Sequence, residues 1–133
     1  MSKHVPIHGL FETHLTVSDL QRSIIFYRDI VGLQLAHEVS EGNAAFFWIG
    51  DHTSRCSMLG LWSVGTAPLG LNLHIAFEVA PINDLLDAPE LLKDHGIVPL
   101  SFFGKESWEP SVIGWMPAAA IYFRDPDGHL IDI

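Results

Sequence analysis

Side chains that could bind a metal or move a proton occur at a few places in this chain. The stretch Phe11-Glu-Thr-His-Leu-Thr-Val17 alternates, so as a strand it places Glu12, His14 and Thr16 on one face. Imidazole and carboxylate groups together suit Zn, Fe, Mn, Ni or Co. The alternative is structural: Glu12 would hydrogen-bond to a neighbour on its own face. His74 stands alone among apolar residues, where a lone histidine is usually a satisfied core residue.

Other chemistries have no matching pattern. The sequence contains no Gly-rich phosphate loop, no Ser-His-Asp order and no Cys-x-x-Cys pair. Cys56 has only Arg55 as a basic neighbour, so we expect a small core residue and not a nucleophile. His129 follows Gly128 in a turn, and we predict a solvated or turn-bonding side chain there.

The composition is that of an ordered globular domain. Apolar residues make up 48% of the 133 residues and charged residues 17%, which excludes intrinsic disorder. The net charge of -9 and the lack of basic clusters exclude a nucleic-acid-binding protein. A single cysteine suits a reducing cytoplasm, and the opening residues lack the apolar core of a signal peptide. We therefore expect a cytoplasmic protein that neither binds nor spans a membrane.

The first half of the chain predicts a strand, a helix and three further strands. The alternating stretch 11–17 is the first strand. Ser18 and Gln21 have the spacing of a capping box, and apolar residues at helical intervals predict an amphipathic helix over 19–31 that ends at Gly32. Turn-forming residues separate three more apolar stretches, predicted as strands over 33–39, 44–49 and 56–62.

The second half repeats this order after a linker at 65–70. We expect a strand over 72–79 and a helix over 82–95 that Pro89 must kink or divide. Further strands are predicted over 97–103, 117–123 and 130–133, with a long loop at 104–114 and a turn at 125–128. The shared order predicts two modules, at about 10–64 and about 71–133, within a single domain over 1–133.

Three segments resemble a known family. They are Val17-Ser-Asp-Leu20 with the following Phe26-Tyr27 and Gly32-Leu33, then His74-Ile-Ala-Phe-Glu-Val79, and last Asp125-Pro-Asp-Gly-His129. Together they resemble the glyoxalase/bleomycin resistance protein/extradiol dioxygenase family, the vicinal oxygen chelate superfamily, over nearly the whole chain. The resemblance implies an α+β fold in which two βαβββ modules form curved mixed sheets around a cleft.

The resemblance also implies where metal ligands would stand, on the first and last strands of each module. Position by position these are Glu12, Gly60, His74 and Asp132, and Gly60 has no side chain. The implied divalent metal site is therefore Glu12, His74 and Asp132, with His14 as a candidate further ligand from the same strand face. Glu12 is also the candidate catalytic residue, because glyoxalase chemistry needs a base beside the open coordination site.

Aromatic residues are the candidates for a substrate pocket. The stretch from Phe102 to Met116 is long for a compact domain, and such loops are often lids or binding loops. Ordinary packing or a dimer contact would explain its aromatic residues equally well. The residues predicted to line the pocket are Trp62, Phe102, Trp108, Trp115 and Tyr122.

Two classes of function remain open from the sequence. One is a metal-dependent lyase, isomerase, transferase or dioxygenase in which a divalent ion chelates two vicinal oxygens of a small substrate. The other is a metal-free protein that binds or sequesters small molecules, as bleomycin resistance proteins do. In either case we expect a homodimer, because curved sheets leave edges and apolar faces to cover.

Overall fold

The computed structural model describes residues 9–51, 57–63, 73–79, 82–115 and 118–133. The chain divides into two compact units, Met1–Pro68 and Leu69–Ile133. Cys56 lies outside the described residues. Within the described ranges, no helix is long and apolar enough to cross a membrane.

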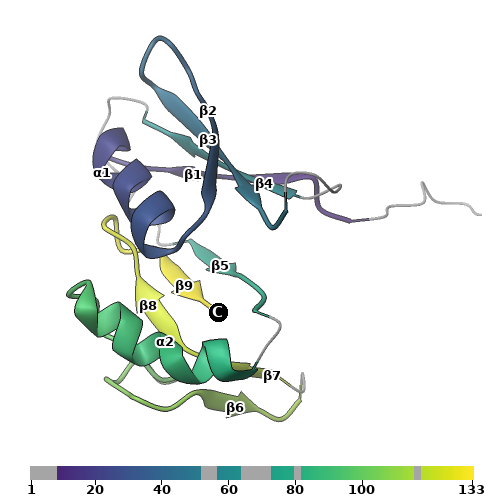
Figure 1. Cartoon of the computed structure of the whole chain (residues 1–133), viewed down its shortest axis with the longest axis vertical. Helices are drawn as coiled ribbons and strands as arrows, with labels where there is room; N and C mark the ends of the chain where they lie inside the picture. The colour runs from purple at the N-terminus through teal and green to yellow at the C-terminus, as the bar shows by residue number, and fades with distance from the viewer. Residues whose placement is uncertain (1–8, 52–56, 64–72, 80–81, 116–117) are drawn as a thin grey trace, which may run out of the picture. The chain divides into compact units, whose positions relative to one another are not determined.

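The first unit has the predicted order of a strand, a helical segment and three strands (Figure 1). Its elements are β1 (Glu12–Thr16), α1 (Leu20–Ile25), η1 (Phe26–Ile30), β2 (Gln34–Glu38), β3 (Ala44–Ile49) and β4 (Ser57–Trp62). The strands form one sheet in the order β1-β4-β3-β2, in which β1 runs parallel to β4 and the other neighbours are antiparallel. The first and last strands of the unit are therefore hydrogen-bonded neighbours.

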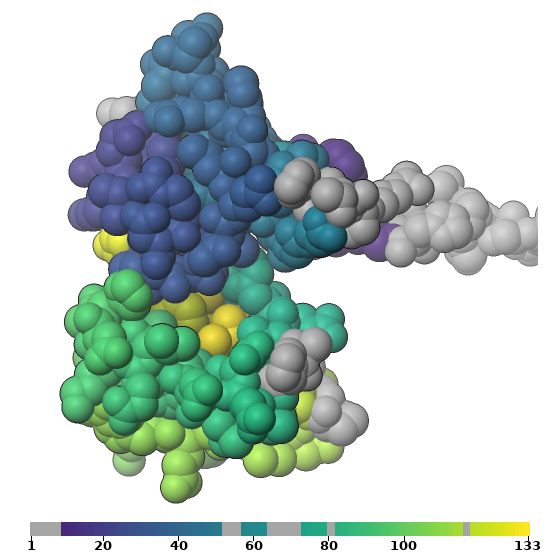
Figure 2. Space-filling view, viewed as in Figure 1, coloured from purple at the N-terminus to yellow at the C-terminus, as the bar shows by residue number. Residues whose placement is uncertain are grey.

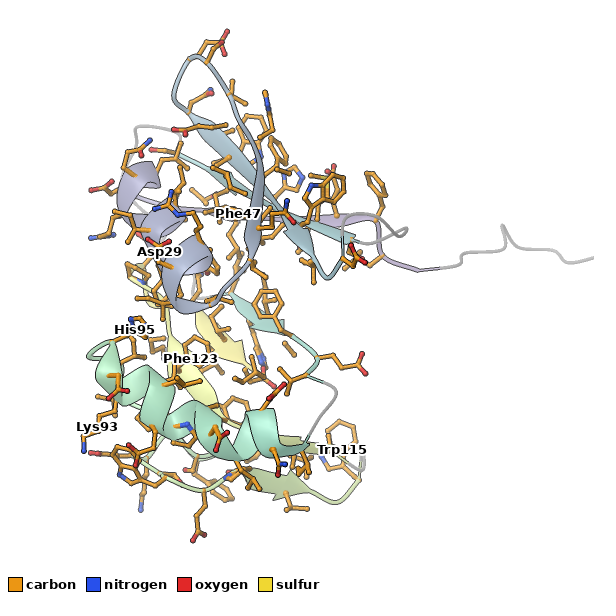
Figure 3. All side chains as sticks on the ribbon, in the orientation of Figure 1. Asp29, Phe47, Lys93, His95, Trp115 and Phe123 are labelled. Atoms are coloured by element: carbon orange, nitrogen blue, oxygen red, sulfur yellow. The ribbon has the colours of Figure 1, made fainter. Side chains whose placement is uncertain are left out.

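The two faces of this sheet differ in character, as the alternation in 11–17 predicts. Leu15 is buried, while Glu12 and His14 on the other face are exposed. The buried face packs on the helical segment, where Leu20, Ile24 and Tyr27 recur at helical intervals. The ring of Phe47, labelled in Figure 3, packs against the ring of Tyr27 in a tilted arrangement, with centroids 6.2 Å apart.

The helical segment departs from the prediction at its first residue and in the type of helix in its second half. Asp19, and not Ser18, is the N-cap, because its carboxylate accepts a hydrogen bond from the backbone N–H of Arg22 at 3.1 Å. The predicted helix over 19–31 is α-helical only to Ile25 and continues as a turn of π-helix. Gly32, at φ 89°, ends it as expected, since a left-handed backbone is open mainly to glycine.

The second unit contains β5 (His74–Ala76), α2 (Ile82–Asp94), β6 (Ser111–Ile113), β7 (Ala118–Ala120), β8 (Tyr122–Arg124) and β9 (Leu130–Asp132). Its main sheet has the order β5-β9-β8, with β5 parallel to β9, and β6 and β7 form a separate antiparallel pair. As in the first unit, the first and last strands are neighbours. The α+β fold class with its repeated strand–helix–strands order is thus confirmed.

Two strand predictions in the second unit were wrong in detail. The stretch 97–103 is not a strand: Leu100 alone makes bridges, to Glu106 and to Tyr122. The expected strand over 117–123 is split at Ile121, and residue 117 lies outside the described part. Ala118–Ala120 pair with β6, whereas Ile121 exchanges backbone hydrogen bonds with Ile133 and the following residues pair with β9. Periodicity does not reveal a change of partner strand within one extended segment.

Helix α2 runs unbroken through Pro89, so the proline does not divide it. Proline inside a helix costs a backbone hydrogen bond, but this one is almost fully buried. Leu85, Ala88 and Leu92 are buried on the same face, so apolar packing holds the helix together around it. In the view of Figure 2 the side chains of α2, in green, lie in front of the yellow strands of this unit.

Candidate functional site

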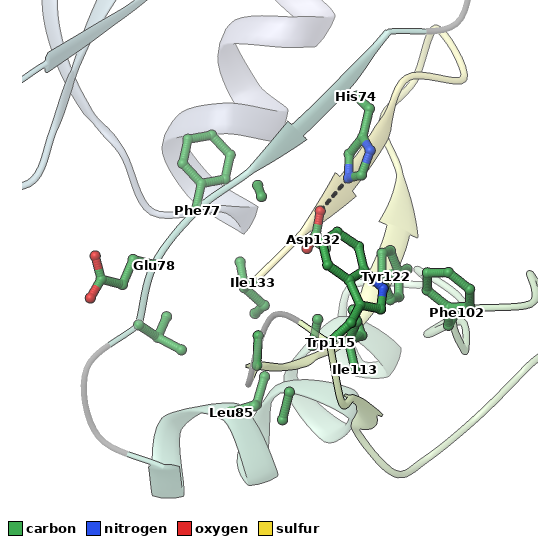
Figure 4. A pocket seen from close by; sticks show the side chains of 15 residues that line it. His74, Phe77, Glu78, Leu85, Phe102, Ile113, Trp115, Tyr122, Asp132 and Ile133 are labelled. Carbon is green, nitrogen blue, oxygen red and sulfur yellow. Dashed lines mark hydrogen bonds and ion pairs between the residues drawn. The ribbon is translucent and has the colours of Figure 1, made fainter. Parts of the chain in front are cut away.

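His74 and Asp132 meet side by side on neighbouring strands of the second unit. The distance from His74 Nε2 to Asp132 Oδ1 is 2.5 Å, within hydrogen-bonding range (Figure 4). The His74 side chain is 53% exposed and that of Asp132 only 13% exposed. A half-exposed imidazole thus faces solvent while a nearly buried carboxylate binds one of its ring nitrogens.

The register of the sheet explains why these two side chains meet. Asp132 lies beside Ala76 in the parallel pair, and its carbonyl oxygen accepts the backbone N–H of Phe77 at 2.7 Å. His74 comes two residues before Ala76, so its side chain projects from the same face of the sheet. The long imidazole then reaches across to the carboxylate on the neighbouring strand.

The Asp125–His129 turn holds the start of β5 in place. Asp125 Oδ1 accepts backbone N–H groups from Asp127 and His129, at 2.9 and 2.8 Å. His129 is buried, and its Nδ1 accepts the backbone N–H of Leu73 at 3.0 Å. The sequence predicted a solvated or a turn-bonding side chain for His129. It is not solvated, because it is buried and accepts a hydrogen bond from Leu73. Sequence analysis missed its role as an anchor for the residue just before His74.

A cavity of about 550 Å³ opens next to the His74–Asp132 pair. Its walls come from all parts of the second unit: Leu85 of α2, Ala118–Ala120 of β7, and aromatic rings that include Phe102, Trp115 and Tyr122 (Figure 4). This size falls within the range of small-molecule sites in proteins. The cavity is thus largely apolar, with the His74–Asp132 pair and Glu78 among the polar residues of its lining.

Tyr122 connects the polar pair to the apolar wall. It lies opposite Asp132 in the antiparallel pair β8–β9, and its ring centroid is 6.3 Å from that of His74. Burial, and next the negative charge of Asp132, raise the pKa of the Tyr122 hydroxyl above its ordinary value. The phenol therefore stays protonated at neutral pH and remains a hydrogen-bond donor.

The first unit carries a second polar cluster on the exposed face of its sheet. His14 Nε2 lies 3.2 Å from Glu12 Oε1, and the indole N–H of Trp62 donates to His14 Nδ1 at 2.8 Å. The His14 and Trp62 rings are stacked, with centroids 6.0 Å apart. An indole N–H can only donate, so Nδ1 carries no proton, and a neutral His14 must hold its proton on Nε2. Nε2 then faces Glu12 Oε1, so each ring nitrogen has a polar neighbour.

Comparison with known proteins identifies the family. The sequence profile of the Glyoxalase/Bleomycin resistance protein/Dioxygenase superfamily matches residues 9–133. This chain belongs to that superfamily. The lactoylglutathione lyase of Escherichia coli O157:H7 is 29% identical over 132 residues, which cover 93% of this chain and 90% of the relative. The enzyme of the same name from Salmonella typhimurium is 28% identical with the same coverage.

Several solved structures share the fold. An integron cassette protein from the mobile metagenome of a Halifax Harbour sewage outfall superimposes with a TM-score of 0.77 at 26% identity, covering 95% of this chain and 97% of that protein. Lactoylglutathione lyase from Agrobacterium tumefaciens gives a TM-score of 0.73 at 21% identity, covering 96% and 93%. The oxidase ChaP-H2 gives 0.71 at 20% identity, covering 95% and 91%.

The residues expected to form the superfamily site fall into two groups. His74 and Asp132 meet in the second unit, and Glu12 and His14 meet in the first. Within either unit, the described residues contain no group of three or more His, Cys, Asp and Glu side chains able to hold a metal. The joining of Glu12 to the His74–Asp132 pair stays a prediction.

Only some of the residues predicted to line the pocket lie in the wall of this cavity. Phe102, Trp115 and Tyr122 line the cavity. Trp108 does not line it and instead stacks under Lys93, whose Nζ lies 4.8 Å from the ring centroid. Trp62 belongs to the first unit, where it binds His14. The substrate-binding role of all five residues stays a prediction.

The His74–Asp132 pair suits a divalent cation in donor type. Bonds of about 2.1 Å at a tetrahedral angle put two ligand atoms about 3.4 Å apart. The two atoms are 2.5 Å apart here, so the half-exposed imidazole would swing outward by about 1 Å to admit an ion. His14 fits less well, because a metal on either of its nitrogens would have to displace Glu12 or Trp62.

Proposed function

We propose that this chain is a metalloenzyme in which a divalent cation holds two adjacent oxygens of a small substrate. The observation that supports it is the His74–Asp132 pair set in the wall of an apolar cavity of about 550 Å³. His74 and Asp132 would hold the ion, with Glu12 as the third ligand or as the base beside it. A bound Zn, Fe, Mn, Ni or Co ion would supply Lewis-acid stabilisation of negative charge on the substrate oxygens.

The protein's own groups have clear tasks in this proposal. The apolar walls exclude water from the reacting end of the substrate, which strengthens electrostatic interactions there. The protonated Tyr122 hydroxyl donates a hydrogen bond to a substrate oxygen. Glu12, whose Oε1 lies 3.2 Å from His14 Nε2, would be the carboxylate that takes up a proton.

The lyase reaction of the enterobacterial relatives is the weaker candidate among the reactions of this type. Gly60 stands where the superfamily resemblance places a fourth ligand, and it supplies no carboxylate. Isomerisation, addition to an epoxide, and ring cleavage with O₂ all begin from the same chelated pair of oxygens. We therefore propose the mode of substrate binding and not one particular reaction.

Metal analysis tests the proposal directly. The protein, purified without a tag and without added metal, should contain about one equivalent of a divalent ion by elemental analysis. His74→Ala and Asp132→Asn should each lose most of it, since two ligands compete poorly with water. His95→Ala, at an exposed residue just beyond α2, is the matched control and should keep its metal. Equal metal content in wild type and His74→Ala would contradict the proposal.

A second pair of variants tests the part assigned to Glu12. Glu12→Gln should lower metal content or the affinity for added metal, whereas Glu41→Gln, at an exposed turn, should not. Unchanged metal binding in Glu12→Gln, with loss in His74→Ala, would assign the ion to the second unit alone.

The alternative is a metal-free protein that binds small molecules. The largely apolar lining of the cavity favours it, as does the lack of a three-ligand cluster among the described residues of either unit. In that case ligand affinity should be the same before and after treatment with a chelator. A chelator that abolishes binding of a vicinal diol would exclude this alternative.

A further inference from the structure

An extra residue in β2 determines which face of the first unit's sheet carries His37. Leu35 lies opposite Phe47 on β3. His37 lies opposite Phe46, so Ala36 is an additional residue in the register, a β-bulge. Directly opposed residues of an antiparallel pair project from the same face of the sheet. His37 therefore shares the face of Phe46, whereas strict alternation from Leu35 would turn it toward the helical segment.

The contact of the next residue, Glu38, agrees with this orientation. Gln21 on α1 donates from Nε2 to Glu38 Oε1 at 2.6 Å, and Glu38 lies opposite the buried Ala45. Glu38 is thus on the face that the helical segment covers, and its neighbour His37 projects from the other face. His37 is exposed, and within the described part of the chain no residue forms a hydrogen bond or ion pair with its imidazole. The ring is therefore available to a ligand.

On this exposed face a row of residues crosses all four strands of the sheet. In register from β2 to β1, the row consists of His37, Phe46, Gly60 and His14. The rings of Phe46 and His14 lie over Gly60 and meet edge to face, with centroids 5.8 Å apart. The Trp62 ring packs on both, with its centroid 6.0 Å from each. These three rings form an aromatic platform that begins directly opposite His37.

Polar side chains stand at both edges of this face. The edge strands of the sheet are β1 and β2. Glu12, the proposed third ligand or base, is on β1, and His37 is on β2. Three strand spacings of about 4.8 Å separate the two backbones by roughly 14 Å. A molecule that extends from Glu12 across the platform would therefore reach His37, whose imidazole can donate or accept a hydrogen bond.

We propose that His37 is a specificity-determining residue, which hydrogen-bonds a polar group at the far end of an elongated substrate. The two adjacent oxygens of the substrate would lie at the Glu12 edge, and the body of the molecule would rest on the aromatic platform. The position of the oxygens rests on the proposed function. The contact with His37 rests on the arrangement of the first unit alone.

Two probes that differ only at the far end test this contact. One is octanohydroxamic acid, whose hydroxamate supplies two adjacent oxygens. The other has a carboxamide in place of the terminal methyl group. Both are uncharged near pH 7, and when extended they span roughly 12 Å, close to the width of the sheet. Calorimetric titration of the zinc-supplied protein measures the affinity for each probe.

Substitution of His37 should affect one probe and not the other. His37→Leu should weaken binding of the carboxamide probe about fivefold, the effect of one net hydrogen bond, and should not weaken binding of octanohydroxamic acid. His37→Asn keeps a hydrogen-bonding group and should restore part of the loss. His95→Leu, at an exposed histidine of the second unit, is the matched control and should change neither affinity. Equal weakening of both probes by His37→Leu, or of neither, would overturn the proposal.

Repeating the titrations after treatment with a chelator separates this inference from the proposed function. If removal of metal changes neither affinity while His37→Leu still weakens the carboxamide probe alone, the metal proposal fails and the assignment of His37 stands. If removal of metal abolishes binding but His37→Leu treats the two zinc-dependent probes alike, the assignment of His37 fails and the metal proposal stands. Failure of both probes to bind, with and without zinc, would overturn both.

Discussion

Gly60 lies directly beside His14 in the parallel pair β1–β4, and the absence of a side chain there makes room for the imidazole. A Cβ at residue 60 would stand 3.2 Å from His14 Cδ2 and 3.0 Å from Phe46 Cε1. Both distances are tighter than ordinary carbon contacts. The position at which relatives are expected to carry a metal-binding side chain is thus filled here by the ring of His14.

We therefore predict that a carboxylate cannot simply be restored at this position. Gly60→Ala should cost about 1 kcal/mol of unfolding free energy by overpacking, and Gly60→Glu about 1–3 kcal/mol because it must displace the His14 ring. Urea denaturation measures both. Gly114→Ala, where a Cβ would meet nothing within 4 Å, is the control and should be nearly neutral. A Gly60→Glu variant as stable as wild type would refute the steric argument.

The hydrogen bond between Trp62 and His14 predicts a single imidazole tautomer. Nitrogen-15 NMR at neutral pH should show His14 with an unprotonated Nδ1 and a protonated Nε2. Trp62→Phe removes the indole donor, so it should release this tautomer and cost about 1 kcal/mol of stability. Trp108→Phe should leave the His14 signals unchanged. A protonated Nδ1 in the wild type would show that the indole contact is not a hydrogen bond.

His129 should control the start of β5. His129→Leu leaves the Leu73 N–H without the acceptor of a part-buried hydrogen bond, and we expect a loss of about 0.5–1.5 kcal/mol. Hydrogen exchange should report faster exchange at Leu73 than in the wild type. His129→Asn supplies an oxygen acceptor near the position of Nδ1 and should restore part of the loss. If the leucine variant keeps full protection at Leu73, the anchor lies elsewhere.

Asp125 should be equally necessary for the turn that carries His129. Asp125→Ala removes the acceptor of two backbone N–H groups and should cost about 2–3 kcal/mol. Asp125→Asn keeps a carbonyl oxygen and should lose less. Thermal unfolding of the two variants at the same pH gives the comparison, and equal losses would show that the charge and not the acceptor geometry stabilises the turn.

Tyr122 predicts a loss of stability at high pH. Its pKa is raised in the folded protein, so above about pH 10 the folded state binds more protons than the unfolded state. The full unfolding free energy is therefore present below the pKa that Tyr122 has in the unfolded chain. It falls as the pH rises through the pKa that Tyr122 has in the folded protein. Denaturation at a series of pH values should show this slope in wild type and a smaller slope in Tyr122→Phe. Identical slopes in the two proteins would contradict the pKa direction.

The sequence predicted much of the fold because its signals are local. Alternation in 11–17, helical spacing from Leu20 to Tyr27 and the glycine at position 32 each depend on a few neighbouring residues. The change of partner at Ile121 and the lack of a strand at 97–103 depend on which distant strand is available. A single sequence carries little information about such pairings.

The sequence named candidate site residues but not the contacts between them. His74 and Asp132 were named from their family positions, and their mutual contact follows from a parallel register that the sequence does not state. The bond between Trp62 and His14 depends on their meeting across β1 and β4, 48 residues apart in sequence. Trp108 was expected in the pocket because it shares a loop with Trp115, but its contact with Lys93 lies outside the cavity lining.

The pairing of first strand with last strand in the second unit has a kinetic consequence. Residues His74 and Asp132 are 58 positions apart, so β5 has no hydrogen-bonding partner in its sheet until a long stretch of chain has been made and ordered. Contacts between such distant residues bear a large loop-closure entropy and slow the folding reaction. During refolding the polar pair should therefore be assembled late, after local structure such as α2. An observable at His74, such as its proton resonances, would then mark the arrival of the native state and not an early intermediate.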